Sequence, residues 1–194
     1  RNGKHIPLLI FGDHNLMNVE GACLVCEGMG VSESQFVEAI QSFSGAAKRL
    51  ELVRKEGTFS CYKDFAHSPS KLKATTAAVK KQFPNRKIVA CMELHTFSSL
   101  TADFLKEYNG AMDTADEAFV YYNPHTIEHK KLSAISVSQV KDAFARTDLK
   151  VSTDSNSLIA ELSSRNWDNS VLLLMTSGNF DGVDFTQFAN SLKL

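Results

Sequence analysis

The chain has 194 residues, 43% of them hydrophobic, and a formal net charge of −1. That length and composition predict one folded domain of ordinary size, or one domain with a piece of another, and exclude a disordered chain. The nearly neutral charge gives no electrostatic reason to expect a nucleic acid or an anionic membrane as partner. No apolar run approaches the roughly 20 residues that span a bilayer.

The first part of the chain, up to about residue 55, differs in pattern from the rest. "HIPLLIFG" (5–12) is typical of a strand, and residues 15–30 predict a helix that Gly30 stops. A second helix is predicted over residues 32–43, because Ser32 with Gln35 three positions later forms a capping-box pattern. One strand and two helices are too little for a domain, so we interpret this part as the tail of something larger.

From about Leu52 onward, apolar strand patterns alternate with helical ones. Strands with little polar interruption are expected when helices cover both faces of a sheet. The alternation therefore predicts an α/β fold, a Rossmann-like doubly wound and mainly parallel sheet. A polar stretch, residues 123–136, is the longest expected loop. Strands are predicted over residues 58–65, 87–94, 117–123, 149–153 and 170–177, and helices over residues 70–83, 100–112, 137–147, 156–166 and 185–192.

The four cysteines predict no disulfide and no metal site. Cys23 and Cys26 have CxxC spacing, but no second CxxC or histidine pair accompanies them, and Cys61 and Cys91 lie in strand-like runs. We therefore expect buried structural thiols in a reducing cytoplasm. We also expect no signal peptide, because the early apolar patch lacks a small-residue cleavage site.

Polar residues gather where the predicted strands end. Ligands of such a sheet bind outside the carboxyl ends of its strands, so this rim is the expected site. Serines and threonines there can simply cap helices, whereas His67 and His95 are poorer caps and favour a site. The residues at these ends are Asp64, His67, Ser68, Glu93, His95, Thr96, Ser98, Asn123, Thr176, Ser177, Gly178 and Asn179.

Several common motifs are missing from the sequence. It has no GxxxxGK[ST] loop to wrap phosphates, no GxGxxG after a strand, and no nucleophile elbow. His125 and His129 are four residues apart and could hold a metal if helical, but they have no obvious third ligand. We therefore predict no metal site within the chain.

Five segments together resemble the Mur ligase family. "GDHNLMN" (12–18) resembles G-x-H-N-x-x-N, and "FSGAAKRLE" (43–51) resembles F-x-G-x-x-R-R. "KDFAHSP" (63–69) resembles D-D-[YF]-A-H-H-P, and "MELHTFSS" (92–99) is similar to a strand end that often reads Q-P-H-R-Y-S-R. The ending "LLLMTSGNFDGVDFTQF" (172–188) resembles that of members that add a tripeptide, while "LHTFSS" is closer to those that add L-alanine.

The resemblance implies a domain organisation. Family members have a UDP-sugar domain, a central ATP domain with a P-loop, and a C-terminal Rossmann-like domain. Residues 1–50 would be the α-rich end of the central domain, and residues 51–194 the C-terminal domain. The missing P-loop would then lie upstream, and Mg²⁺ would be held mainly there.

The resemblance also implies a reaction. Members phosphorylate a carboxylate with ATP and let an amine attack the acyl phosphate, while domain closure excludes water. The expected substrates are UDP-N-acetylmuramate and either the tripeptide L-alanyl-γ-D-glutamyl-meso-diaminopimelate or L-alanine. The remaining partner would be the rest of the same chain. A fragment of this kind is expected to be inactive alone.

The motif positions imply roles for particular residues. His14, Asn15, Asn18 and Arg49 match positions near the nucleotide; an amide can read a purine edge, and a guanidinium can steady phosphate charge.

Asp64, His67 and His95 match positions that face the reacting centre, so we expect them to be catalytic. His95, Ser98, Ser177 and Asn179 are the expected substrate contacts.

The sequence departs from the family motifs at several positions. Lys63 replaces an aspartate, Ser68 a histidine, and Lys48 an arginine, while Thr96 and Ser99 depart from the alanine-adding pattern. The Lys63 departure weakens the case for a ribose contact at that position.

A different class of function remains open from the residues alone. A doubly wound domain with Asp64 at a strand end loosely resembles a signalling receiver. That class needs further acids near the first strand and a lysine after the last, which the sequence does not clearly supply.

Overall fold

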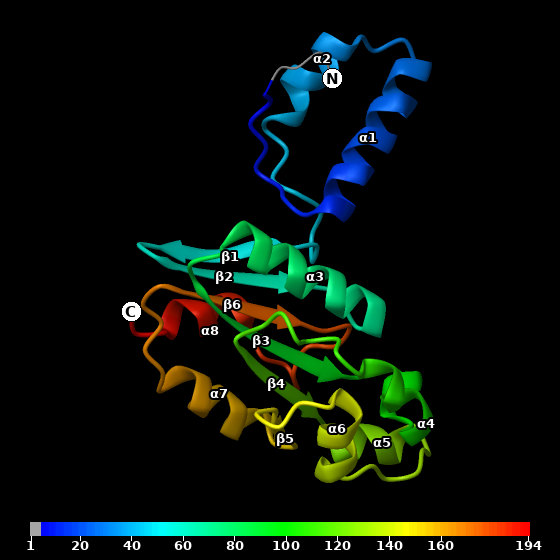
Figure 1. Cartoon of the computed structure of the whole chain (residues 1–194), viewed down its shortest axis with the longest axis vertical. Coiled ribbons are helices and arrows are strands. Elements are labelled where there is room, and N and C mark those ends of the chain that lie inside the picture. The colour runs from blue at the N-terminus through cyan, green and yellow to red at the C-terminus, as the bar shows by residue number, and fades with distance from the viewer. Residues whose placement is uncertain (1–4) are drawn as a thin grey trace.

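The structure is a computed structural model that describes residues 5–194. Its order of elements matches the expected alternation of strands and helices (Figure 1). The elements are α1 (Asp13–Gly28), α2 (Glu33–Ile40), β1 (Glu51–Glu56), β2 (Phe59–Asp64), α3 (Pro69–Gln82), β3 (Lys87–Leu94), η1 (Ser98–Leu100), α4 (Ala102–Leu105), η2 (Lys106–Tyr108), β4 (Glu117–Tyr122), α5 (Pro124–His129), α6 (Val137–Phe144), β5 (Lys150–Ser152), α7 (Ser155–Ser163), β6 (Ser170–Met175) and α8 (Phe185–Ser191).

One six-stranded sheet forms the centre, with strand order β1-β2-β6-β3-β4-β5. Strands β2, β6, β3, β4 and β5 run parallel, and only β1 is antiparallel, paired with β2. The predicted mainly parallel α/β sheet is therefore confirmed. The register places Asp64 opposite Met175, and Met175 opposite Met92, so three strands end at the same edge.

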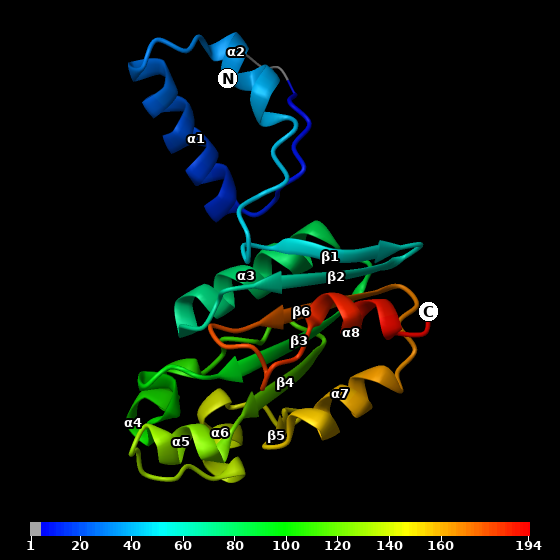
Figure 2. The same ribbon diagram turned by 180° about the vertical axis from the view of Figure 1, so that it is seen from behind.

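Helices cover both faces of the sheet. Helices α3, α4, α5 and α6 pack on one face, and α7 and α8 on the other, which is turned to the viewer in Figure 2. Alternate residues of each strand point to opposite faces. In β3, for example, Ala90 and Met92 join the first core while Val89 and Cys91 join the second.

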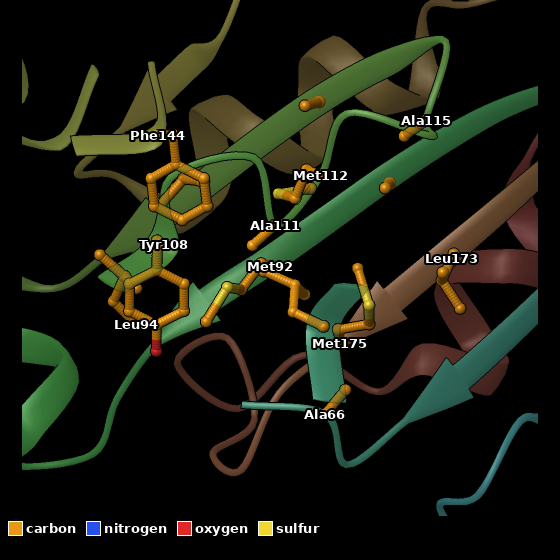
Figure 3. Packing of buried hydrophobic residues seen from close by; sticks show 14 of the residues in the cluster. Ala66, Met92, Leu94, Tyr108, Ala111, Met112, Ala115, Phe144, Leu173 and Met175 are labelled. Carbon is orange, nitrogen blue, oxygen red and sulfur yellow. The ribbon is translucent and has the colours of Figure 1, made fainter. Parts of the chain in front are cut away.

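The first core is the larger one. Figure 3 shows Met92 of β3 close to Met175 of β6, with Leu94 beside Tyr108 and Phe144 beyond them. The rings of Tyr108 and Phe144 stack with centroids 5.0 Å apart. The strands are buried on both faces, which explains why their sequences are almost continuously apolar.

The N-terminal helices α1 and α2 stand apart from the sheet in both views (Figures 1 and 2). The Phe11 ring packs edge-on against Tyr62 and Phe83, and Lys81 forms an ion pair with Asp13 at 3.0 Å. The capping box of Ser32 and Gln35 at the start of α2 is confirmed, and Gly30 follows α1 with a left-handed φ of 88°. These contacts fix the tail at one end of the sheet.

Three local predictions are wrong, and one strand was not predicted. Residues 5–12 form no strand, because no segment in the described residues pairs with them. The helix expected over 100–112 breaks into η1, α4 and η2, because Thr101 is extended and Gly110 turns the chain with φ 69°. The expected loop 123–136 begins with helix α5, capped by Asn123. Strand β1 was not predicted, since its charged edge sequence lacks an apolar run.

Cys23, Cys61 and Cys91 are buried, Cys26 is half-buried, and none forms a disulfide. Burial raises the pKa of the Cys61 thiol to about 12, so this group stays an inert thiol at neutral pH. Within residues 5–194, no helix has the length and apolar character needed to cross a membrane.

Candidate functional site

The expected rim exists where β2, β6 and β3 end. The N–H of Thr176 donates to the Asp64 carbonyl at 3.0 Å, so the chain leaving β6 runs directly beside the end of β2. The segments that carry His67, Ser177 and His95 therefore leave neighbouring strands at the same edge. The sequence pattern predicted that these segments lie close together, because polar residues directly follow each of these strands.

Asp64 lies at the end of β2 and is 5% exposed. One carboxylate oxygen accepts the N–H of Leu50 and the other that of Ala66, each at 2.7 Å. The Thr75 hydroxyl lies 3.5 Å from the same oxygen as Ala66. Asp64 thus joins the linker before β1 to the first turn after β2, and both of its carboxylate oxygens bind backbone N–H groups.

Lys63 has a structural partner in the same linker. Its ammonium group pairs with Glu51 at 2.9 Å, and the second Glu51 oxygen accepts the N–H of Lys48 at 2.7 Å. Lys48 and Leu50 both have left-handed backbones, with φ of 57° and 44°. The lysine that departs from the family motif therefore helps to hold a strained connection between the tail and the sheet.

His67 lies in the turn before α3, where Pro69 begins the helix. Its Nδ1 is 2.9 Å from the Phe65 carbonyl, which can only accept, so Nδ1 carries the proton. Its own carbonyl accepts the Tyr108 hydroxyl at 2.6 Å. In the neutral ring, Nε2 is consequently the nitrogen that can accept a proton or hydrogen bond from a ligand.

His95 follows β3 and is accompanied by a buried acid. The His95 side chain is 38% exposed, and Nδ1 lies 3.5 Å from Oε1 of Glu93, whose side chain is only 3% exposed. The other Glu93 oxygen accepts the Thr176 hydroxyl and the Phe180 N–H. The sequence placed Glu93 at the rim but gave it no role.

The other three predicted substrate contacts, besides His95, differ in their surroundings. Ser98 is exposed at the start of η1, with its hydroxyl 3.3 Å from that of Thr96. Asn179 uses its side-chain oxygen to accept the Gly182 N–H at 3.0 Å, a local turn contact. The Ser177 hydroxyl is buried and has no hydrogen-bond partner within residues 5–194. An orphaned buried hydroxyl at this rim is available to a ligand.

A separate cavity of about 510 Å³ lies in the helical tail, between α1, α2 and the linker. It contains all the residues that the motifs placed near a nucleotide: His14, Asn15, Asn18 and Arg49. Asn15 is held by donating its amide to the Phe11 carbonyl at 2.8 Å. The remaining walls, including Ile10, Ala22, Ile40 and Phe43, are mostly apolar. A flat aromatic base with polar edges fits such a lining.

A smaller cavity of about 230 Å³ shares His14 and Arg49 with the first. Its other lining residues include Asp64, at the end of β2, and Ser70 and Lys71, at the start of α3. The two cavities thus join the tail to the strand-end rim. Lys71 was missed by the sequence reasoning; a lysine in a first helical turn, where cations are disfavoured, was the available signal.

A third, polar cavity of about 590 Å³ lies at the ends of β4 and β5. Asn123, Asp154 and Asp181 are among its lining residues. Asn123 donates its amide to the Asp181 carboxylate at 2.7 Å, and the Tyr121 hydroxyl donates to the same oxygen. Burial, together with this hydrogen bond to Asp181, raises the pKa of Tyr121. Only Asn123 was singled out from the sequence.

The candidate metal ligands are scattered among the described residues. No group of three or more histidine, cysteine, aspartate or glutamate side chains comes together in residues 5–194. His125 and His129 do lie on one helix, α5, and His125 pairs with Glu128 at 3.4 Å. The tail cavity, by contrast, combines apolar walls with the amides of Asn15 and Asn18 and the guanidinium of Arg49.

The fold and its strand-end rim define a mainly parallel α/β domain that follows a helical tail. Residues 48–178 match the family described as Mur ligase, glutamate ligase domain. The chain belongs to the Mur ligase family.

Among relatives, the UDP-N-acetylmuramate–L-alanine ligase of Cytophaga hutchinsonii is 29% identical over 98% of this chain and 39% of its own length. That of Caldicellulosiruptor bescii is 37% identical over 60% of this chain and 25% of its own. The chain therefore spans two fifths or less of the length of these relatives.

Two solved structures share the fold. The UDP-N-acetylmuramate–alanine ligase of Thermotoga maritima has a TM-score of 0.70 at 19% identity, covering 93% of this chain and 39% of that one. The murein peptide ligase of Psychrobacter arcticus has a TM-score of 0.63 at 20% identity, covering 93% and 37%.

Proposed function

We propose that the chain is the C-terminal part of an ATP-dependent ligase that joins UDP-N-acetylmuramate to an amino substrate through an acyl phosphate. The observation that carries this is the tail cavity, which gathers His14, Asn15, Asn18 and Arg49 in a chain of the Mur ligase family. In this proposal residues 1–50 complete a central ATP domain and residues 51–194 form the C-terminal domain; residues 1–4 lie outside the described part.

In this proposal the residues of the tail cavities bind the nucleotide, and the residues of the strand-end rim face the reacting centre. ATP supplies the phosphoryl group that activates the carboxylate. Asn15 and Asn18 would read the base, while Arg49 and Lys71, which line the connected cavity, would face the phosphates. At the rim, His67 and His95 would face the reacting centre, with Ser98, Ser177 and Asn179 near the amino substrate. Asp64 would act by holding the linker in place.

The rest of the protein would cover the tail. Large apolar residues of α1 are exposed, including Met17 at 74%, Val25 at 63% and Met29 at 79%. A helix that is apolar around most of its surface is normally buried. The remaining part of the central domain, together with the P-loop and Mg²⁺, would lie against this helix. The proposed location is the cytoplasm, where the cell makes the activated substrates of this chemistry.

For the amino substrate we propose the tripeptide L-alanyl-γ-D-glutamyl-meso-diaminopimelate, as in a murein peptide ligase. The ending "MTSGNFDG" supports it, and so does the polar cavity at the ends of β4 and β5, which at about 590 Å³ has room for far more than alanine. The alternative is L-alanine, and the relatives named above favour it.

Assays of the full-length protein separate these substrates. With ATP, Mg²⁺ and UDP-N-acetylmuramate, we expect ADP formation and product, detected by mass, to depend on the tripeptide. Turnover with L-alanine alone would select the alternative, and no ADP with either would refute the ligase assignment.

The nucleotide cavity has its own test in the same assay. We expect Asn18→Leu to raise the KM for ATP about tenfold, the equivalent of one hydrogen bond of roughly 1.4 kcal/mol. Lys55→Met on exposed β1 serves as the matched control. An unchanged KM for ATP in the Asn18 variant would remove this residue from the nucleotide site.

A further inference from the structure

The end of β3 carries a buried carboxylate, Glu93, with polar partners at both of its oxygens. Glu93 is 83 and 87 positions away in sequence from its partners Thr176 and Phe180. Both partners donate to Oε2, the Phe180 N–H at 3.0 Å. Oε1 is therefore the oxygen that faces His95, 3.5 Å from Nδ1. This arrangement satisfies one oxygen with the protein backbone and a hydroxyl, and leaves the other to the imidazole.

The loop after β6 fixes the same pair from a second side. A Cβ added to Gly178 would lie 2.6 Å from Glu93 Oε2 and 2.8 Å from the His95 ring. The Gly178 N–H donates to the Thr176 hydroxyl at 2.6 Å, which directs the hydroxyl proton toward Glu93. A larger residue would meet both groups there, so the backbone of this loop packs directly against the Glu93 carboxylate and the His95 ring.

We propose that Glu93 is a positioning residue that keeps the proton of the neutral His95 ring on Nδ1 and leaves Nε2 as its proton-accepting nitrogen. A carboxylate can only accept hydrogen bonds, so it favours a protonated nitrogen opposite it. The protonation of one ring nitrogen decides what the other can do. Nε2 lies across the ring from Glu93, on a side chain that is partly exposed at the rim.

This assignment deepens the proposed function and, in its catalytic part, rests on it. Nε2 would take a proton from the ammonium group of the amino substrate. The freed nitrogen lone pair would form the bond to the acyl carbon, the bond from that carbon to the phosphate oxygen would break, and a second amine proton would leave with the phosphate. Atoms and charges balance with no further reactant.

Glu93→Gln is the sharpest variant. Glutamine has almost the same size and shape as glutamate but carries no charge. Its carbonyl can still accept from Thr176 and Phe180, but its NH₂ group would then face Nδ1 and donate to it. The ring proton should therefore move to Nε2, which converts the outward nitrogen from an acceptor to a donor.

Nitrogen NMR of the histidine rings tests the assignment on this chain itself, at about pH 9, where an ordinary histidine with a pKa of roughly 6.5 is neutral. We expect His95 to be protonated at Nδ1 in the natural sequence and at Nε2 in Glu93→Gln. His67 is the internal control, because its Nδ1 contact is to a backbone carbonyl and should not change. A proton on Nε2 of His95 in the natural sequence would overturn the proposal, and this result does not require the variant to fold. In a folded Glu93→Gln variant, an unchanged His95 tautomer would also overturn it.

The full-length protein gives the catalytic readout. Glu93→Gln should lower kcat by roughly 10²-fold or more, the usual effect of a general base, with little change in the KM for the amino substrate. A raised KM with unchanged kcat would show a binding role and contradict the base assignment. Failure of the natural full-length protein to form product would refute the proposed function, while the NMR result would still decide the tautomer.

Discussion

At the scale of single residues, Asp64 is the side chain whose geometry differs most from its expected role. Its two oxygens hold the N–H groups of Leu50 and Ala66, so it stabilises the linker on which the tail depends. A motif can predict that an acid lies at this corner, but the backbone groups that it binds come from 14 residues earlier and two later. Local spacing does not reveal the first of these contacts.

Asp64→Asn should therefore destabilise the fold. An amide has only one accepting oxygen, so its NH₂ group would oppose one of the two N–H donors, at a cost of about 1–3 kcal/mol. Urea denaturation measures the change, with the exposed Glu107→Gln as control. Equal stability of the two variants would show that Asp64 does not hold the linker, and would return it to the list of ligand contacts.

At the scale of elements, β1 depends on the end of the chain. The Arg54 guanidinium donates to the carbonyls of Ala189 at 2.6 Å and Leu192 at 3.0 Å, at the C-terminal end of α8. Positive charge there also suits the helix dipole. The antiparallel edge strand and the last helix are thus joined by one side chain.

Arg54→Met should free the end of α8. We expect faster amide hydrogen exchange in residues 185–192 and a loss of about 2 kcal/mol, the scale of hydrogen bonds from a charged donor. Lys55→Met, on the same strand with its side chain exposed, should leave exchange unchanged. Faster exchange throughout the sheet, rather than at α8, would contradict a local role.

The elements differ in how far the sequence predicts them. Strands β2, β3, β4 and β6 were predicted because they are apolar on both faces, which leaves a continuous signal. β1 was missed because its charges suit a solvent-facing edge, and the helix around α4 was overextended because propensity outweighed Thr101 and Gly110. The contacts of Glu93 with Thr176 and Phe180 could not be predicted, since these partners lie more than 80 residues away in the sequence.

At the scale of the whole molecule, the apolar surface of α1 predicts self-association of the isolated chain. Leu24 is 55% exposed, and Val25 lies beside it. A double change of both to Glu should shift the chain toward a monomer in light scattering at increasing concentration, because exposed apolar surface drives association. Val137→Glu on α6 is the matched control. Equal self-association of the two variants would show that the chains do not associate through α1.

The central claim is that this chain serves a ligase that activates a carboxylate as an acyl phosphate. Its most direct test uses UDP-N-acetylmuramate labelled with ¹⁸O in the carboxylate, together with ATP, the amino substrate and the full-length protein. The acyl-phosphate mechanism predicts ADP as the nucleotide product and one labelled oxygen transferred to inorganic phosphate in each turnover. Label in AMP, or product formed without label in phosphate, would contradict it.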